Sequence, residues 1–150
     1  MSDKKQIYFA GAIRGDRVEA ENIIALIRYI QELGHEVLTE HIAEKNISDA
    51  SMKAEEIEKR DILWLDSATH VIAEISGAST GTGREIEYAR TKHHFGKTKA
   101  HILCLYDETR KFFASPMIRG MTPERYENIT VKKYKDLQGA KEIIKKFLGS

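Results

Sequence analysis

The chain has 150 residues, which is enough for one domain built around a single hydrophobic core. It is 41% hydrophobic and 31% charged, and its 24 Lys and Arg residues nearly balance 23 Asp and Glu residues. This composition is typical of a globular protein and lacks the basic excess expected of a nucleic-acid-binding surface. We therefore predict a single domain over residues 1–150, with no nucleic-acid polymer as its partner.

The compartment is predicted from cysteine usage and from the absence of a targeting pattern. Cys104 is the one cysteine, so no internal disulfide forms, and its apolar neighbours predict a packed thiol. Residues 1–6 show no apolar signal segment, and no stretch approaches the roughly 20 apolar residues that span a bilayer. These features favour a cytoplasmic protein, or a nuclear one if the source is eukaryotic. The near-neutral charge leaves self-association open.

Apolar runs alternate with helical patterns along the chain. Strands are predicted at residues 7–10, 35–39, 70–75, 100–106 and 128–134. Helices are predicted at residues 18–33, 52–66, 84–94 and 137–148. The stretch 112–125, which holds both prolines, is predicted to be a loop or a short helix.

This alternation predicts a flavodoxin-like or Rossmann-like three-layer α/β sandwich, with a five-stranded, mostly parallel sheet between layers of helices. The run 70–75 is nearly continuously apolar, as expected of a strand that is buried on both faces. In open sheets of this class, ligands bind outside the carboxyl ends of the strands. The segments that follow the strands are therefore the expected site of function.

Two glycine-rich segments follow predicted strands, at residues 11–15 and 77–83, and each is predicted to be a turn that leads into a helix. Backbone N–H groups at such a turn bind anions, and Arg14 adds a positive charge. Together the segments favour an anion site over plain turn chemistry. Neither has the nicotinamide fingerprint or a Walker lysine, so hydride transfer and ATP hydrolysis are not predicted.

Glu85 and Asp61 are the carboxylates best placed for chemistry. Glu85 falls in the first turn of its predicted helix, where the helix dipole favours the ionised form that a nucleophile needs. A solvated surface role for Glu85 stays an open alternative. Asp61 precedes the apolar run 62–65, so we expect it near a buried face, where a carboxyl must be paired or protonated. Two such groups can divide nucleophile and proton-donor duties at a glycosidic carbon.

The six histidines are scattered and do not have the spacing of a metal site. We predict no metal and no redox cofactor. His41 follows the predicted strand 35–39, and it is expected either to line the crevice or to cap a loop.

Five blocks of sequence resemble, in their order, those of a known family. They are Tyr8–Gly15, Leu38–His41, Asp61–Leu65, Ser79–Glu85 and Ser115–Gly120. The match extends over about residues 7–134. It is similar to the 2′-deoxynucleoside 5′-phosphate N-hydrolases, within the wider nucleoside 2-deoxyribosyltransferase family. The block Met117–Gly120 separates this group from the transferases.

The resemblance implies an N-glycosidase that hydrolyses 2′-deoxynucleoside 5′-monophosphates to a free base and 2-deoxyribose 5-phosphate. It implies that Glu85 is the nucleophile and forms a covalent glycosyl-enzyme. It also implies that Tyr8 orients this carboxylate and that Asp61 assists base departure and sugar positioning. The chemistry agrees, because positive charge develops at C1′ and a carboxylate beneath that carbon stabilises it.

The resemblance further implies a homodimer and a substrate-binding set. The set is Gly11, Ala12, Ile13, Arg14, Gly15, Ser79, Gly81, Ser115 and Met117, with His41 added as a crevice residue. Ser115 and Met117 would reach the site across the dimer interface. No cofactor is implied.

The chain departs from the family at Ala12, where serine is frequent, so one hydroxyl donor is lost. A neutral hydrogen bond is worth about 0.5–1.5 kcal/mol, and the charged Arg14 is expected to matter more. Three alternatives remain open: a nucleoside 2-deoxyribosyltransferase, a ribonucleoside monophosphate N-glycosidase and a non-catalytic nucleotide-binding module. Base preference is not predicted, because base pockets are largely apolar and built from loops.

Overall fold

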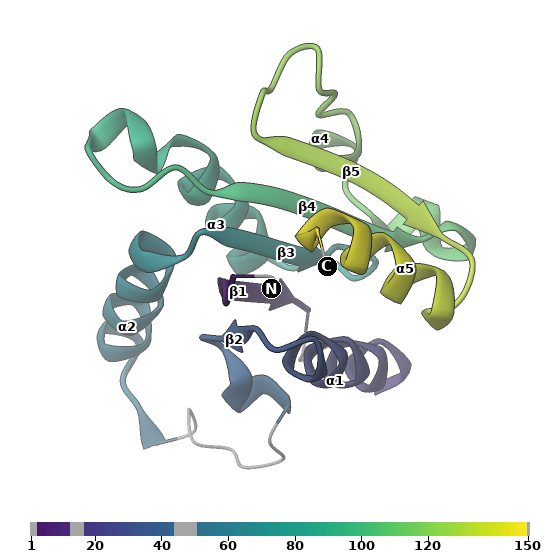
Figure 1. Ribbon diagram of the computed structural model, residues 1–150, viewed down its shortest axis with the longest axis horizontal. Coiled ribbons are helices and arrows are strands. Elements are labelled where there is room, and N and C mark those ends of the chain that lie inside the picture. Colours follow the sequence, from purple (N-terminus) through teal and green to yellow (C-terminus); the bar gives the residue numbers. More distant parts are fainter. Residues whose placement is uncertain (1–2, 13–16, 44–50, 150) are drawn as a thin grey trace.

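The computed structural model describes residues 3–12, 17–43 and 51–149. Its strands form one parallel sheet in the order β2-β1-β3-β4-β5 (Figure 1). They are β1 (Gln6–Gly11), β2 (Glu36–Val37), β3 (His70–Glu74), β4 (His101–Asp107) and β5 (Ile129–Tyr134). The predicted α/β class is confirmed, and the strand order is that of flavodoxin-like folds.

Helices cover both faces of the sheet (Figure 1). One face packs against α1 (Arg17–Glu32) and α5 (Leu137–Leu148), and the other packs against α2 (Ala54–Ser67) and α3 (Thr80–Thr91). The shorter helical segments are η1 (Glu40–Ala43), η3 (Lys92–Phe95), η4 (Glu108–Phe113) and α4 (Pro116–Arg119). No helix of the described ranges has the length and apolar character needed to cross a membrane.

The alternation of side chains along β1 decides which residues face the site. Ile7 and Phe9 enter the core shared with α1 and α5, whereas Tyr8 and Ala10 enter the core beneath α2 and α3. The predicted burial of the 70–75 strand on both faces is confirmed for residues 71–75. Tyr8 is thereby directed toward the helices that follow β2 and β3.

Two predicted boundaries were wrong. The predicted strand 35–39 is reduced to β2, because the hydroxyl of Thr39 bonds both backbone groups of Phe9, at 3.0 Å from its nitrogen and 2.8 Å from its oxygen. The predicted turn 77–83 ends at Ser79, which caps α3 by accepting a hydrogen bond from the backbone nitrogen of Thr82 at 3.2 Å. Gly81 and Gly83 therefore lie inside the helix, although each glycine disfavours it by about 1 kcal/mol.

The strand order of the sheet reverses between β1 and β3. These strands are neighbours, and Gly11 pairs with Glu74. The chain leaves β1 toward α1 on one face and leaves β3 toward α3 on the other, which makes this the point where ligands bind in such sheets. A Cβ atom on Gly11 would lie 2.6 Å from Cδ1 of Ile23, so the end of that side chain would have to shift if Gly11 were replaced.

Candidate active site

Glu85 on α3 and Tyr8 on β1 form the centre of the site. The Tyr8 hydroxyl, almost fully buried, donates a hydrogen bond to Oε2 of Glu85. Burial raises the pKa of Glu85 to about 7, the Tyr8 hydrogen bond opposes that rise, and the charge of Asp61 adds to it. Burial also raises the pKa of Tyr8, so the phenol stays protonated and acts as the donor. The dipole at the start of α3 favours the ionised form of Glu85, whereas burial raises its pKa.

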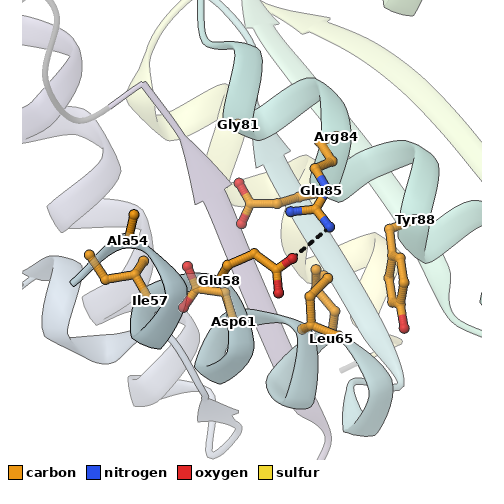
Figure 2. Close-up of a pocket in the computed structure, with 10 residues that line it drawn as sticks. Ala54, Ile57, Glu58, Asp61, Leu65, Gly81, Arg84, Glu85 and Tyr88 are labelled. Carbon is orange, nitrogen blue, oxygen red and sulfur yellow. Dashed lines mark hydrogen bonds and ion pairs between the residues drawn. The ribbon is translucent and has the colours of Figure 1, made fainter. Parts of the chain in front are cut away.

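Asp61 approaches Glu85 from α2, on the other side of the pocket (Figure 2). Its Oδ1 atom lies 3.0 Å from Nε and 2.9 Å from Nη2 of Arg60. The Asp61 side chain is 28% exposed. The expectation of a paired carboxyl near a buried face is met by this contact.

A pocket of about 280 Å³ lies between α2 and α3, with Asp61 and Glu85 directed into it (Figure 2). Its remaining lining is mostly apolar and comprises Ala54, Ile57, Ile62, Leu65, Gly81 and Tyr88 together with the ion pair of Glu58 and Arg84. In that pair, Nη2 of Arg84 lies 2.9 Å from Oε2 of Glu58. Apolar walls with a few convergent polar groups suit a planar, polar-edged ligand such as a nucleobase.

The amino end of α3 provides anion-binding groups next to this pocket. Ser79 Oγ accepts hydrogen bonds from the backbone nitrogen of Thr82 at 3.2 Å and from its hydroxyl at 3.0 Å. The hydroxyl proton of Ser79 is therefore available for a hydrogen bond to a ligand. A Cβ atom on Gly81 would lie 3.9 Å from Ser79 Oγ and 4.0 Å from Glu85 Oε1. Gly81 therefore separates the helix start from the carboxylate without filling the space between them.

Ser79 also lines a second pocket, of about 210 Å³, with Ser115 of the same chain. Ser115 caps α4 by accepting a hydrogen bond from the backbone nitrogen of Met117 at 3.2 Å. Met117 is 83% exposed and lines neither pocket. The structure thus brings Asp61, Gly81 and Glu85 to one pocket, where the buried Tyr8 bonds to Glu85, and it brings Ser79 and Ser115 to a second pocket.

The other predicted substrate-binding residues lie apart from this pocket or outside the described ranges. The ring of His41 packs 5.5 Å from that of Trp64, and its Nε2 lies 3.5 Å from Nη2 of Arg60. Gly11 ends β1, and the buried Ala12 follows it. Ile13, Arg14 and Gly15 lie outside the described residues. Binding roles for this set stay predictions.

Arg60 is a site residue that the sequence reasoning missed. Neighbouring residues of a helix do not face each other, so its place directly before Asp61 gave no signal of contact. The Glu58–Arg84 pair was missed for a different reason, because its partners lie on separate helices, α2 and α3.

The described residues include no cluster of three or more His, Cys, Asp and Glu side chains that could hold a metal ion. Cys104 is buried as predicted, and burial raises the pKa of its thiol to about 12.

Comparisons with known proteins identify the family of the chain and support its fold. The family model described as nucleoside 2-deoxyribosyltransferase matches residues 7–139. A Nematostella vectensis protein named "Putative 2′-deoxynucleoside 5′-phosphate N-hydrolase 1" is 37% identical over 142 residues, covering 91% of this chain and 90% of that protein. An Esox lucius protein named 5-hydroxymethyl-dUMP N-hydrolase is 32% identical over 141 residues, covering 91% and 92%. The solved structure of Clostridium botulinum CMP N-glycosidase, BcmB, has the same fold, with a TM-score of 0.67 and 21% identity over 95% of this chain and 99% of that one.

Proposed function

The chain belongs to the nucleoside 2-deoxyribosyltransferase family, and from this premise we propose that it hydrolyses 2′-deoxynucleoside 5′-monophosphates to a free base and 2-deoxyribose 5-phosphate. Relatives named as N-hydrolases of deoxynucleotides support an N-glycosidase. The observation that carries the proposal is the carboxylate of Glu85, held by Tyr8 and facing Asp61 across an otherwise largely apolar pocket.

In the proposed first step, an oxygen of Glu85 bonds to C1′ of the sugar. The bond from C1′ to the base nitrogen breaks, and its electron pair leaves with the base. The positive charge that develops at C1′ is stabilised by the carboxylates of Glu85 and Asp61. Tyr8 holds Glu85 so that one oxygen faces the sugar.

In the second step, water attacks C1′ and releases Glu85 as a carboxylate. One hydrogen of the water stays on the anomeric hydroxyl of 2-deoxyribose 5-phosphate. The other leaves as a proton and supplies the one that the departed base takes up at its nitrogen. Glu85 must be ionised to begin the cycle. With a pKa of about 7, it is ionised in roughly half of the molecules at neutral pH.

The 5′-phosphate is proposed to bind at the amino end of α3, through Ser79 and Gly81. Gly81 and Glu85 stand one turn apart on the same side of α3, about 6 Å along the axis. An anion at the helix start is stabilised by free N–H groups and by the helix dipole. Arg14 in the segment 11–15 is proposed to complete the phosphate site.

A homodimer is part of the proposal. Phe112, Phe113 and Met117 are 94%, 63% and 83% exposed, which places large apolar side chains on one short stretch of surface. Such a patch favours an interface. Ser115 of the same chain lines the Ser79 pocket, so its contribution from a second copy, like that of Met117, is proposed from the family resemblance and from this exposed patch. The lone buried thiol of Cys104 fits the reducing cytoplasm, where we propose that the enzyme acts.

The direct test is a panel assay for released base. Deoxy- and ribonucleoside 5′-monophosphates, 5-hydroxymethyl-dUMP and unphosphorylated deoxynucleosides are each incubated with the protein and separated by chromatography. We expect release from deoxynucleoside monophosphates, none with Glu85→Gln, and near-normal release with the control Glu87→Gln, whose carboxylate binds Arg90 instead. Arg14→Ala should weaken the binding of monophosphates far more than the binding of nucleosides. Unchanged release by Glu85→Gln would remove Glu85 from the mechanism.

The description of the family model names a different reaction, in which a second base intercepts the glycosyl-enzyme and a nucleoside is formed by transfer. Adding a second base to the same assay distinguishes the two reactions. Formation of a new nucleotide at the expense of 2-deoxyribose 5-phosphate would favour transfer. Tight binding of a monophosphate with no base release would favour a non-catalytic module.

A further inference from the structure

Arg60 lies behind Asp61 rather than in the pocket, and several neighbours hold its guanidinium group. It contacts Oδ1 of Asp61 through Nε at 3.0 Å and Nη2 at 2.9 Å. Its Nη1 lies 3.3 Å from Sδ of Met52, its Nη2 lies 3.5 Å from Nε2 of His41, and its Cζ stands 4.7 Å from the centre of the Trp64 ring. The side chain is only 21% exposed. This environment fixes a long side chain that would otherwise be free to move.

The contact with Asp61 is one-sided. Both Arg60 nitrogens reach Oδ1, and no bond to Oδ2 is found within the described residues. Asp61 lines the pocket, whereas Arg60 does not. Oδ2 is therefore available to accept a hydrogen bond from a ligand, while Oδ1 fixes the orientation of the carboxylate.

Helix geometry explains why this support is needed. Neighbouring residues of α2 point in different directions, so only a long side chain that bends back can reach Asp61. Trp64 lies one turn after Arg60 and presents its ring as the platform on which the guanidinium rests. The ring of His41 also packs against the Trp64 ring, with 5.5 Å between the two ring centres. A lysine would supply the charge without the rigid planar donors.

We propose that Arg60 is the positioning residue for Asp61, and that Trp64 and His41 hold it in place. The inference rests on the proposed function, in which Asp61 contacts the substrate, and it assigns Arg60 no contact of its own with the substrate. Arg60 acts by fixing Oδ1, so that Oδ2 meets the ligand without first losing rotational freedom. His41 accordingly contributes from behind the pocket rather than from its lining.

A double-mutant cycle tests this assignment. Base release from dGMP and 5-hydroxymethyl-dUMP is measured for the wild type, Arg60→Ala, Asp61→Ala and the double variant. We expect Arg60→Ala to lower kcat/KM about tenfold to a hundredfold, the range for a charged hydrogen bond, and to have less than a twofold effect once Asp61 is alanine. Arg60→Lys should retain part of the activity. Millimolar methylguanidine should partly restore Arg60→Ala but not the double variant.

Arg90→Ala is the matched control. Arg90 binds Glu87 through Nε and Nη2, both at 2.7 Å, and stacks 5.0 Å from the Tyr126 ring, away from the pocket. The Arg90→Ala substitution should change kcat/KM by less than twofold. A general loss of helix stability would lower the melting temperature of Arg60→Ala, but methylguanidine would then fail to restore activity.

Two results would overturn the inference: equal losses from Arg60→Ala with and without Asp61, or no loss at all. Failure of the proposed function is recognised separately, because the wild type itself would then release no base from either substrate. In that case the same cycle is read from the Kd for dGMP by calorimetry, with the same expected non-additivity. A wild type that neither binds nor cleaves any monophosphate of the panel would reject both.

Discussion

Replacing Tyr8 with phenylalanine removes the hydrogen bond that opposes the raised pKa of Glu85. A hydrogen bond to a charged group is worth about 1.5–3 kcal/mol, which corresponds to about one to two pKa units. The pKa of Glu85 should therefore rise from about 7 toward roughly 8 or 9. At pH 7 the ionised fraction would fall from about one half to between roughly one tenth and one hundredth.

The assay is the pH dependence of kcat/KM for base release, which reports the ionisation of the free enzyme. In the wild type, kcat/KM should rise with pH and level off above the pKa of Glu85, about 7. With Tyr8→Phe, the rise should move up by one to two pH units, so that activity is lost about fivefold to fiftyfold at pH 7 and largely recovered near pH 9.5.

Tyr88→Phe is the matched control for this experiment. The Tyr88 hydroxyl lies at the same pocket but donates to Oδ1 of Asp66 at 2.6 Å, so its removal should leave the pH of the rise in place. A pH-independent loss in Tyr8→Phe, or a rise displaced to lower pH, would refute the reasoning, because the phenol would not then be stabilising the carboxylate of Glu85.

Other residues give further tests. Ser79→Ala should lower the free energy of unfolding by about 1 kcal/mol in urea titrations, through loss of the α3 cap, and should also weaken monophosphate binding; an unchanged affinity would remove Ser79 from the phosphate site. Burial, with the neighbouring His101, lowers the pKa of His70 to about 4, so the unfolded chain takes up this proton first and stability should fall between pH 7 and pH 4. His70→Asn should reduce this loss of unfolding free energy by about 1 kcal/mol, a value lowered to allow for the partial solvent exposure of His70. An equal loss in both proteins would contradict the assignment. Phe112→Ser with Met117→Ser should yield a monomer in sedimentation experiments at concentrations where the wild type is a dimer, and an unaltered dimer would place the interface elsewhere.

The fold followed from periodicity because each strand is short, apolar and separated from the next by a helical pattern. The same reasoning placed Gly11 and Ser79 at the carboxyl edge of the sheet, where the structure has them. It failed at the start of α3, since glycine propensity argued for a turn and the Ser79 hydroxyl supplied the cap that let the helix begin. It failed at β2 because the Thr39 side chain bonds to Phe9 in a way that local pattern does not reveal.

The pKa values of the site residues depend on how deeply the side chains are buried, and the sequence pattern alone does not give that depth. A helix dipole is worth about 0.3–1 kcal/mol, less than one pKa unit, at exposed positions. The pKa of Glu85 instead rises from 4.5 to about 7, so desolvation beneath α2 and α3 decides the direction. The role of Arg60 was equally unreadable, because it depends on the side chain bending back onto Asp61 and resting on Trp64.

The central claim is that the carboxylate of Glu85 bonds to C1′. It is tested most directly by mixing the protein with a 2′-fluoro-arabino deoxynucleoside monophosphate, which slows release of the sugar, and recording the intact mass and peptide map. The account predicts a stable increment equal to one fluorinated sugar phosphate, located on the peptide that contains Glu85 and absent from Glu85→Gln. Release of base with no adduct, or an adduct on another residue, would contradict it.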